Sequence, residues 1–219
     1  MQPEFWLERW QTREIGFHRS YVHPMLERWW PTLGVSPDRA VYVPLCGKSL
    51  DLHWLADRGH RVTGGELSPI AIREFFEEAG LEPAAATLGT HVKHAAGPYT
   101  LIEGDALALA PSDVGALGAA YDRAALVALP PDLRRRHART LASLLPAGAP
   151  VLLISFEYDQ AKMDGPPFSV QAAEVRALFE PDFDVLELER NEVIGESPRF
   201  VEAGLDALHE VAWKLVRRG

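Results

Sequence analysis

The chain has 219 residues, 47% of them hydrophobic and 24% charged, which is enough apolar material to bury a core without disulfide or metal support. Its 31 acidic residues outnumber its 22 basic residues, and the formal charge of -9 argues against nucleic acid or an anionic membrane surface as a partner. The single cysteine, Cys46, excludes an internal disulfide, and neither the acidic, aromatic N-terminus nor any later apolar run is typical of a secretory signal or a membrane span; a cytoplasmic protein is expected.

Strand and helix patterns alternate after the first 38 residues. Arg39–Pro44 predicts a strand and Leu50–Arg58 a helix. Arg61–Gly64 then predicts a second strand and Pro69–Ala79 a helix, where proline suits the first turn, so one β-α-β unit is complete. The predicted strands that follow are Tyr99–Glu103, a weaker one ending at Tyr121-Asp122-Arg123, Val151–Phe156, Phe183–Arg190 and Leu208–Val216, and the helices are Pro131–Leu145 and Ser169–Phe179. Such alternation is typical of an α/β fold with a mostly parallel sheet, here as one domain over residues 1–219.

Three segments carry weaker patterns. The alanine-rich piece Ala84–Ala96 predicts an insertion loop with a short helix, on which His91 and His94 form a surface pair. The stretch Glu192–Asp206 has no clear periodicity and is long enough for a functional loop. The arginines of 134–136 occupy consecutive helical positions and point in different directions, which favours a solvated face over a phosphate-binding track.

The turn after the first strand, Pro44–Ser49, is the place to look for a ligand, because open parallel sheets bind at the carboxyl ends of their strands. Gly47-Lys48-Ser49 invites a phosphate-loop interpretation, but that motif needs a glycine where Tyr42 stands. A dinucleotide fingerprint needs several glycines and this turn has one. A cofactor with adenosine but no phosphates, such as S-adenosylmethionine, needs only a tight turn and backbone contacts.

An acidic residue at the end of the second strand supports adenosine binding. Glu66 follows the turn by about 20 residues, the spacing expected of a carboxylate that accepts hydrogen bonds from ribose hydroxyls. Asp105, after the third strand, is a candidate adenine contact. The alternatives are a plain turn for the glycine and for Asp105, and a helix-start charge for Glu66.

Several longer stretches resemble the thiopurine S-methyltransferase family. They occur in the family's order along nearly the whole chain: FWLERW (5–10), Gly16-Phe17-His18, PLCGKSLDLHWLADRGH (44–60), Gly65-Glu66-Leu67-Ser68, Glu74-Phe75-Phe76, YDRAALVALP (121–130) and GPPFSV (165–170). The first long element joined to the DRAALVAL element is far more specific than a generic adenosine pattern. One departure is Gly65, where the family often has valine.

The resemblance implies a seven-stranded, Rossmann-like S-adenosylmethionine-dependent methyltransferase sheet with an N-terminal helical lid over residues 1–35. The implied cofactor contacts are Trp10, Leu45, Glu66 and Arg123, to which we add Trp6, Gly47, Asp105 and Ala106. The implied substrate contacts are Phe17, His18 and Arg199. No metal site is expected, and a monomer suits a site built within one chain.

The expected reaction is methyl transfer to the sulfur of a small aromatic or heterocyclic thiol. Arg123 and Arg199 would orient the acceptor and favour its thiolate, and no general base is assigned. The alternatives are an ion pair of Arg123 with Asp122 and a solvated charge at Arg199. Trp6, Trp10 and Phe17 could close over the cofactor, whereas Trp29 and Trp30 are expected in the core.

Two other functions stay open at this point. One is methylation of selenium or tellurium oxyanions or their reduced species, and the other is an adenosine-binding module without catalysis. Cys46 would be a nucleophile only if a histidine approached it.

Overall fold

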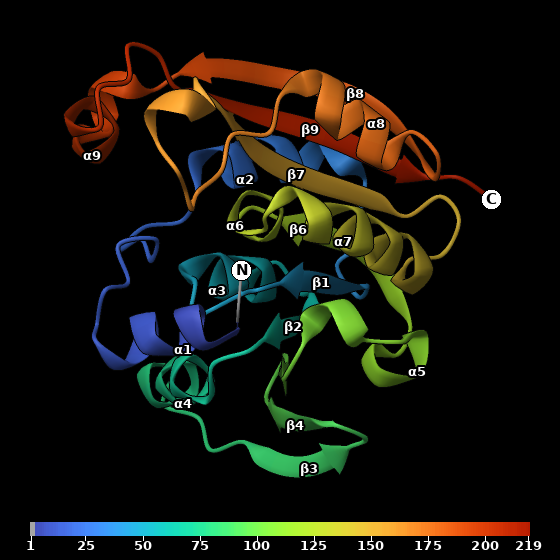
Figure 1. Ribbon diagram of the computed structural model, residues 1–219. Helices are drawn as coiled ribbons and strands as arrows, with labels where there is room; N and C mark the ends of the chain where they lie inside the picture. The colour runs from blue at the N-terminus through green and yellow to red at the C-terminus, as the bar shows by residue number, and fades with distance from the viewer. Residues whose placement is uncertain (1–2) are drawn as a thin grey trace.

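One twisted nine-stranded sheet forms the centre of the molecule, with helices on both faces (Figure 1). The computed structural model describes residues 3–219, so the first two residues of the predicted domain and of the predicted lid lie outside it. The strands are β1 (Ala40–Pro44), β2 (Arg61–Glu66), β3 (Ala84–Leu88), β4 (His91–Ala96), β5 (Tyr99–Glu103), β6 (Leu117–Asp122), β7 (Pro150–Glu157), β8 (Phe183–Glu192) and β9 (His209–Arg217). Their order across the sheet is β3-β4-β5-β2-β1-β6-β7-β9-β8.

The five central strands, β5, β2, β1, β6 and β7, are parallel. β9 runs antiparallel to both β7 and β8, and β4 runs antiparallel to both β3 and β5. The chain order first moves outward from β1 through β2 to β5 and then returns to the other side of β1 at β6. The strand order therefore reverses beside β1, where β-α-β sheets form their ligand sites.

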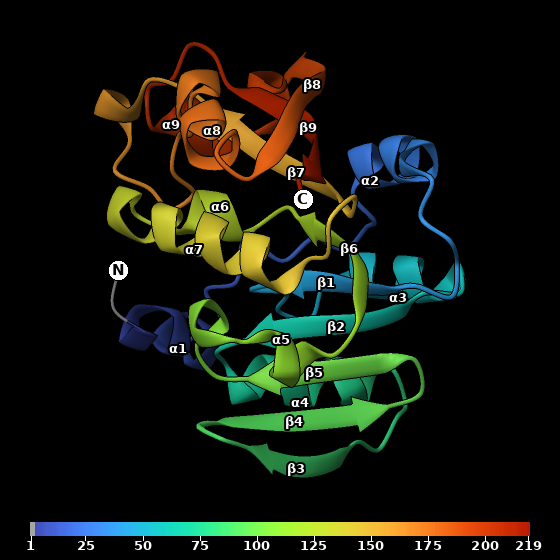
Figure 2. The same cartoon turned by 90° about the vertical axis from the view of Figure 1, so that its right-hand side faces the viewer.

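Different helices pack on each face of the sheet. The helices are α1 (Pro3–Gln11), α2 (Pro24–Trp29), α3 (Leu50–Asp57), α4 (Pro69–Glu78), α5 (Pro111–Val114), α6 (Ala125–Ala128), α7 (Pro131–Leu144), α8 (Ala172–Phe179) and α9 (Pro198–Glu202). α7 and α8 bury Leu141 and Phe179 against one face of the sheet, and α3 and α4 bury Leu55 and Phe75 against the other. Figure 2 shows the two layers of helices in front of and behind the sheet.

The predicted core strands are confirmed, but the strand count of seven is wrong. Residues 84–96, predicted as a loop with a short helix, form the β3-β4 hairpin, which adds two strands beyond β5. Alanine has little strand preference, so the local pattern missed this hairpin. The unpaired edge of β5 supplies the partner: Val92 to Ala96 pair with Glu103 to Tyr99, which satisfies the backbone groups of β4.

Three side-chain predictions are also corrected. His91 and His94 lie on strand β4 rather than on a helix, and His91 is buried. Arg134 is buried instead of solvated: its guanidinium donates two hydrogen bonds of 2.7 and 2.8 Å to the Glu174 carboxylate on α8. Trp30 is in the core as predicted, whereas Trp29 is only partly buried and donates its indole N–H to Glu189 at 2.6 Å.

Residues 3–33 divide into two parts. α1 lies beside α4, next to the carboxyl ends of β1 and β2 (Figure 2). In contrast, α2 and the 3₁₀ turn Trp30–Leu33 pack on the sheet near β7. Only the part before α2 is therefore placed to cover a site at the strand ends. None of the helices within residues 3–219 combines the length and the apolar character needed to cross a bilayer.

Candidate functional site

A cavity of about 600 Å³ opens at the carboxyl ends of β1, β2 and β6. Its walls come from α1 and the loop that follows it, from the turn after β1, from the ends of β2 and β6, and from two later segments around residues 165–167 and 196–200. Of the predicted site residues, the cavity lining contains Trp6, Trp10, Phe17, His18, Leu45, Gly47, Glu66, Arg123 and Arg199. Segments from both ends of the sequence thus meet at one place.

The turn after β1 has an unusual backbone. Leu45 and Gly47 have φ angles of 45° and 53°, in the left-handed region. Glycine adopts this conformation without steric cost. For Leu45 the same conformation costs roughly 1–3 kcal/mol of backbone strain, as is common at ligand-binding turns. Cys46, between them, donates its N–H to the carbonyl of Gly65 at 3.1 Å, so the turn is hydrogen-bonded to the end of β2.

Glu66 binds this turn through its side chain. Its Oε2 accepts the N–H of Gly47 at 2.8 Å and its Oε1 accepts the N–H of Ser68, at the start of α4, at 2.7 Å. The residue is 6% exposed, and burial raises the pKa of its carboxyl, although the backbone N–H groups oppose that shift. Glu66 is therefore both a cavity residue and the helix-start charge that was the alternative interpretation. Each carboxylate oxygen can accept one more hydrogen bond.

Close packing explains the two glycines before Glu66. A Cβ at Gly64 would lie 2.5 Å from the Cys46 sulfur, and a Cβ at Gly65 would lie 2.9 Å from the Tyr42 hydroxyl oxygen. The Tyr42 hydroxyl thus occupies space that a valine at position 65 would need. The Cys46 side chain packs in the same way against Gly64, where only a small side chain has room. Burial raises the pKa of the Cys46 thiol well above the ordinary value. No hydrogen bond between Cys46 and a histidine occurs in the described chain, so the structure gives no support to a nucleophilic cysteine.

An aromatic cover lies over the turn. The rings of Trp6 and Trp10 contact that of Phe17 edge to face, with centroids 5.5 and 5.7 Å apart. Trp10 is buried and its ring lies beside Gly47. Arg13, just after α1, forms an ion pair with Glu74 on α4, and Glu74 also pairs with Lys48 at 3.1 Å. The cover is therefore attached to the body of the molecule by charged contacts.

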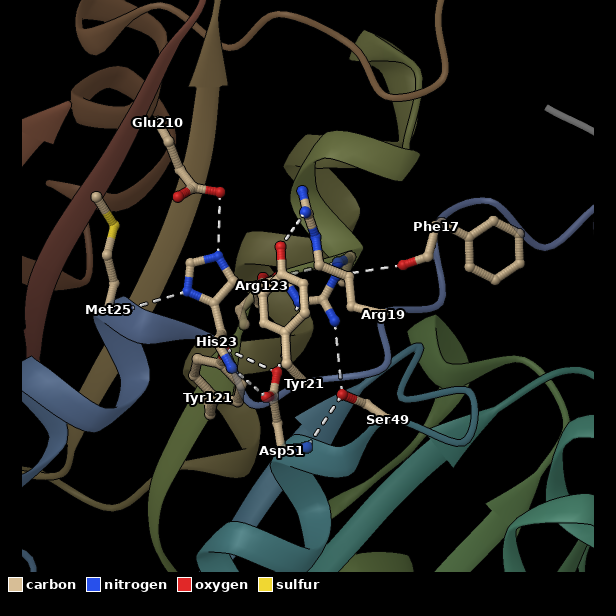
Figure 3. Close-up of polar contacts among 12 residues, drawn as sticks. Phe17, Arg19, Tyr21, His23, Met25, Ser49, Asp51, Tyr121, Arg123 and Glu210 are labelled. Atoms are coloured by element: carbon tan, nitrogen blue, oxygen red, sulfur yellow. Dashed lines mark hydrogen bonds and ion pairs between the residues drawn. The ribbon is translucent and has the colours of Figure 1, made fainter. Parts of the chain in front are cut away.

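Arg123 is held by a polar network behind the cavity (Figure 3). Its Nε lies 3.5 Å from Oδ2 of Asp51, which is buried on α3 and also accepts the Tyr121 hydroxyl at 3.0 Å. Its terminal nitrogens lie 3.5 Å from the Phe17 carbonyl and from the Ser49 hydroxyl. The network connects the cover, the turn after β1 and the end of β6.

The predicted alternative for Arg123, an ion pair with Asp122, is wrong. Asp122 points the other way: its carboxylate accepts the N–H groups of Ala125 and Leu126 at the start of α6 and pairs with His137 at 2.6 Å. Consecutive residues at a strand end face opposite sides of the sheet, which separates the two charges.

The second arginine arrives from the segment predicted as a loop. Residues 192–206 contain a 3₁₀ turn and α9, and Arg199 on α9 donates to the carbonyl of Pro166 at 3.2 Å at the rim of the cavity. His18 lines the cavity as well. Burial lowers its pKa, as do the nearby charges of Lys48 and Arg123, which keeps the ring neutral near pH 7.

Asp105 and Ala106 lie outside the cavity lining. Asp105 caps the short 3₁₀ turn Ala106–Ala108 by accepting the N–H of Leu107 at 2.9 Å, and its other oxygen pairs with Arg136 at 3.0 Å. These contacts match the turn-residue alternative. Ala106 is buried beneath the same turn. The roles predicted for both residues in cofactor binding stay predictions.

Sequence reasoning missed several cavity residues. They include Arg19, Tyr21, Lys48, Ser49 and Glu210. Lys48 and Ser49 belong to the stretch examined for a phosphate loop, and the failure of that motif left them without a role. Glu210 comes from the far end of the chain, and only its place on β9 opposite Phe156 of β7 brings it to the site.

The chain is similar in sequence to known proteins along its length. The family model for thiopurine S-methyltransferase matches residues 1–218. A thiopurine S-methyltransferase of Xanthomonas campestris is 49% identical over 217 residues, covering 99% of this chain and 100% of the relative, and one of Shewanella amazonensis is 45% identical over 218 residues, covering 100% of both. Both relatives therefore align along their full length.

Solved structures agree on the fold. A methyltransferase of Anabaena variabilis superposes with a TM-score of 0.68 at 15% identity, covering 99% of this chain and 95% of that one. The 1,6-didemethyltoxoflavin-N1-methyltransferase of Burkholderia thailandensis, solved with S-adenosylhomocysteine, superposes with a TM-score of 0.66 at 15% identity, covering 99% and 87%. The fold is that of S-adenosylmethionine-dependent methyltransferases, and by sequence the chain belongs to the thiopurine S-methyltransferase family.

Proposed function

We propose that this S-adenosylmethionine-dependent methyltransferase transfers the methyl group to the sulfur of a small aromatic or heterocyclic thiol. One observation carries the proposal: a single cavity under an aromatic cover joins the buried Glu66 carboxylate to the guanidinium groups of Arg123 and Arg199. The Glu66 carboxylate is suited to bind the hydroxyl groups of a nucleoside. The two arginines are suited to bind a soft, anionic nucleophile.

The residues at the Glu66 end fit the cofactor. A buried carboxylate with spare acceptor capacity suits ribose hydroxyl groups, which are hydrogen-bond donors. We propose that Glu66 binds the ribose, that the strained turn of Leu45 and Gly47 contacts the methionine end, and that Trp6 and Trp10 cover the cofactor. When bound, S-adenosylmethionine supplies an electrophilic methyl group on a sulfonium sulfur.

The residues at the other end would bind the acceptor. Arg123 and Arg199 favour the thiolate form of a thiol, because a nearby cation stabilises the anion. The Phe17 ring can contact the ring of an aromatic acceptor. His18 is neutral, so we assign the positive charge that faces the acceptor to Arg123 and Arg199. Holding the sulfur in line with the methyl carbon would supply much of the rate, since orientation alone can lower the barrier by roughly 7–11 kcal/mol.

Incubation with radiolabelled S-adenosylmethionine and a panel of acceptors tests the proposal. The panel contains thiophenol, a heterocyclic thiol, selenite and tellurite, with phenol as the oxygen control. We expect label in the methyl thioethers and none in anisole. Preferential methylation of the selenium or tellurium compounds would replace the thiol assignment, and cofactor binding without any transfer would favour a module that only binds adenosine.

A further inference from the structure

Glu210 is a largely buried carboxylate in the wall of the cavity, at the acceptor end. It is the second residue of β9 and lies opposite Phe156 of β7, which also lines the cavity. Its side chain is only 13% exposed. Glu210 has no part in the proposed contacts with the cofactor or in the proposed role of Arg123 and Arg199.

One oxygen of Glu210 is occupied by a histidine whose tautomer is determined by the fold. His23 caps α2: its Nδ1 accepts the N–H of Met25 at 3.2 Å, so the ring proton of the neutral imidazole is on Nε2. Nε2 lies 3.0 Å from Oε1 of Glu210 and therefore donates to it (Figure 3). The backbone N–H of His23 donates in turn to Asp51 at 2.8 Å, which holds the backbone of His23 against α3.

The other oxygen, Oε2, has no donor among the described residues. Within residues 3–219 no hydrogen bond reaches Oε2, and the two nearby arginines are engaged elsewhere, Arg123 with Asp51 and Arg19 with the Tyr21 hydroxyl. Glu210 is nevertheless ionised near pH 7: burial acts to raise its pKa, but the hydrogen bond and electrostatic interaction with His23, followed by the charges of Arg19 and Arg123, outweigh it and lower the pKa. Glu210 lines the cavity and its Oε2 is not fully buried, so a ligand that enters the cavity takes the place of water at a charged acceptor and is favoured if it brings a donor.

We propose that Oε2 of Glu210 accepts a hydrogen bond from an N–H group of the methyl acceptor, so that the enzyme selects thiols whose ring carries such a donor. The proposal rests on the proposed function and specifies its substrate class further. A thiol without the donor displaces water from Oε2 without replacing its hydrogen bond, and sites built around a hydrogen bond reject analogues that lack it. A hydrogen bond to a charged group corresponds to about a 10- to 100-fold preference.

Glu210→Gln is a sharp probe because His23 orients the new amide. The Nε2–H of His23 needs an acceptor, so in this variant the amide oxygen takes the place of Oε1 and the NH₂ group takes the place of Oε2. The variant therefore puts a donor where the wild-type enzyme has an acceptor, with almost no change in volume. Glu210→Asp, which withdraws the carboxylate by one methylene, is the second variant. Glu187→Gln on β8, outside the cavity lining, is the matched control.

The test compares acceptors that differ only in the donor. The three aminobenzenethiol isomers are paired with the three methylbenzenethiol isomers, and kcat/KM is measured for each. We expect the wild type and Glu187→Gln to prefer at least one amino isomer about 10-fold or more over its methyl partner. Glu210→Gln should abolish that preference, so that the amino-to-methyl ratio of kcat/KM falls to about 1, and Glu210→Asp should weaken it.

A role of Glu210 in charge balance alone predicts a different result. In that case the substitution would lower kcat/KM for both members of each pair alike, and an unchanged amino-to-methyl ratio in Glu210→Gln overturns the proposal. Calorimetric binding of aniline and toluene to the protein saturated with S-adenosylhomocysteine gives the same comparison without turnover. If no thiol is methylated but aniline binds better than toluene only when Glu210 is present, the proposed function fails and the donor preference stands.

Discussion

The backbone N–H of Gly47 donates to the Glu66 carboxylate across 2.8 Å, so the turn after β1 and the end of β2 form one hydrogen-bonded unit. The strained Leu45 is close to this contact, and Trp10 of the cover packs on Gly47. A change at Glu66 therefore reaches the backbone of the turn as well as any ligand bound there.

Replacing Glu66 by alanine should weaken S-adenosylmethionine binding about 10- to 100-fold, because hydrogen bonds to a charged group are lost and the turn loses its anchor. Isothermal titration calorimetry gives the dissociation constant directly. Glu77→Ala, which removes an exposed carboxylate from α4, is the control and should bind like the wild type. An unchanged affinity in Glu66→Ala would remove Glu66 from the cofactor site.

The same variant should reveal the raised pKa of Glu66. The folded state holds the Glu66 proton more tightly than the unfolded chain does, so the contribution of this group to stability is present at low pH. That contribution is lost as the pH rises from the ordinary glutamate pKa of about 4.3 through the raised value. The difference in unfolding free energy between the wild type and Glu66→Ala, from urea melts without cofactor, should therefore shrink with rising pH. A difference that grows with pH would mean that the pKa is lowered.

Replacing Arg123 by methionine should reduce kcat/KM for a thiol about 10- to 100-fold and shift the pH–rate profile to higher pH. Without the cation, a larger fraction of the bound acceptor stays protonated at a given pH. Arg135→Met, an exposed position on α7, serves as the control. A loss of rate with no shift of the profile would show that Arg123 acts only by orienting the acceptor.

The packing of Gly65 against Tyr42 can be measured by a double-mutant cycle. Gly65→Ala should destabilise the protein by about 1–3 kcal/mol, because its Cβ would lie 2.9 Å from the Tyr42 hydroxyl and 3.0 Å from the Cβ of Ala106. The Tyr42 hydroxyl is buried without a hydrogen-bond partner among the described residues, so Tyr42→Phe alone should be neutral or stabilising. The double variant should recover part of the loss, and strict additivity in urea denaturation would contradict the contact.

Glu74→Gln should loosen the aromatic cover, because it removes the charge that pairs with Arg13 and Lys48. We expect faster tryptic cleavage after Arg9 and Arg13 and a several-fold higher dissociation rate of S-adenosylmethionine, with little change in global stability. Stopped-flow fluorescence of the cover tryptophans measures the rate. Identical cleavage in Glu74→Gln and in Glu77→Gln would show that the ion pairs do not hold the cover.

Local sequence signals were sufficient for the part of the site that lies on one β-α-β unit. Pro44–Ser49 and Glu66 are about 20 residues apart, and a strand-turn-helix-strand pattern brings them together without help from the rest of the chain. The resemblance to known sequences extended this to Trp10, Phe17, Arg123 and Arg199, all of which line the cavity.

Distant packing decided the rest. Amino-acid propensity gave no sign of the β3-β4 hairpin, because its strands depend on the open edge of β5 for their hydrogen bonds. Arg134 is buried only because α8 brings Glu174 to it. Asp51 and Glu210 have no local signal of a site: one is an ordinary residue in the first turn of a helix and the other an ordinary strand residue, and the sheet brings both to Arg123 and His23.

The sequence by itself therefore determined the strand, turn and carboxylate at the Glu66 end of the cavity, since these depend on residues close together in the chain. Only the tertiary structure decided which groups meet at the Arg123 end of the cavity, because α1, the segment after β6, α9 and β9 contribute residues that lie far apart in the sequence. No local sequence pattern indicates that these distant segments come together. Their meeting follows from the burial of two helix layers on a sheet whose strand order reverses beside β1.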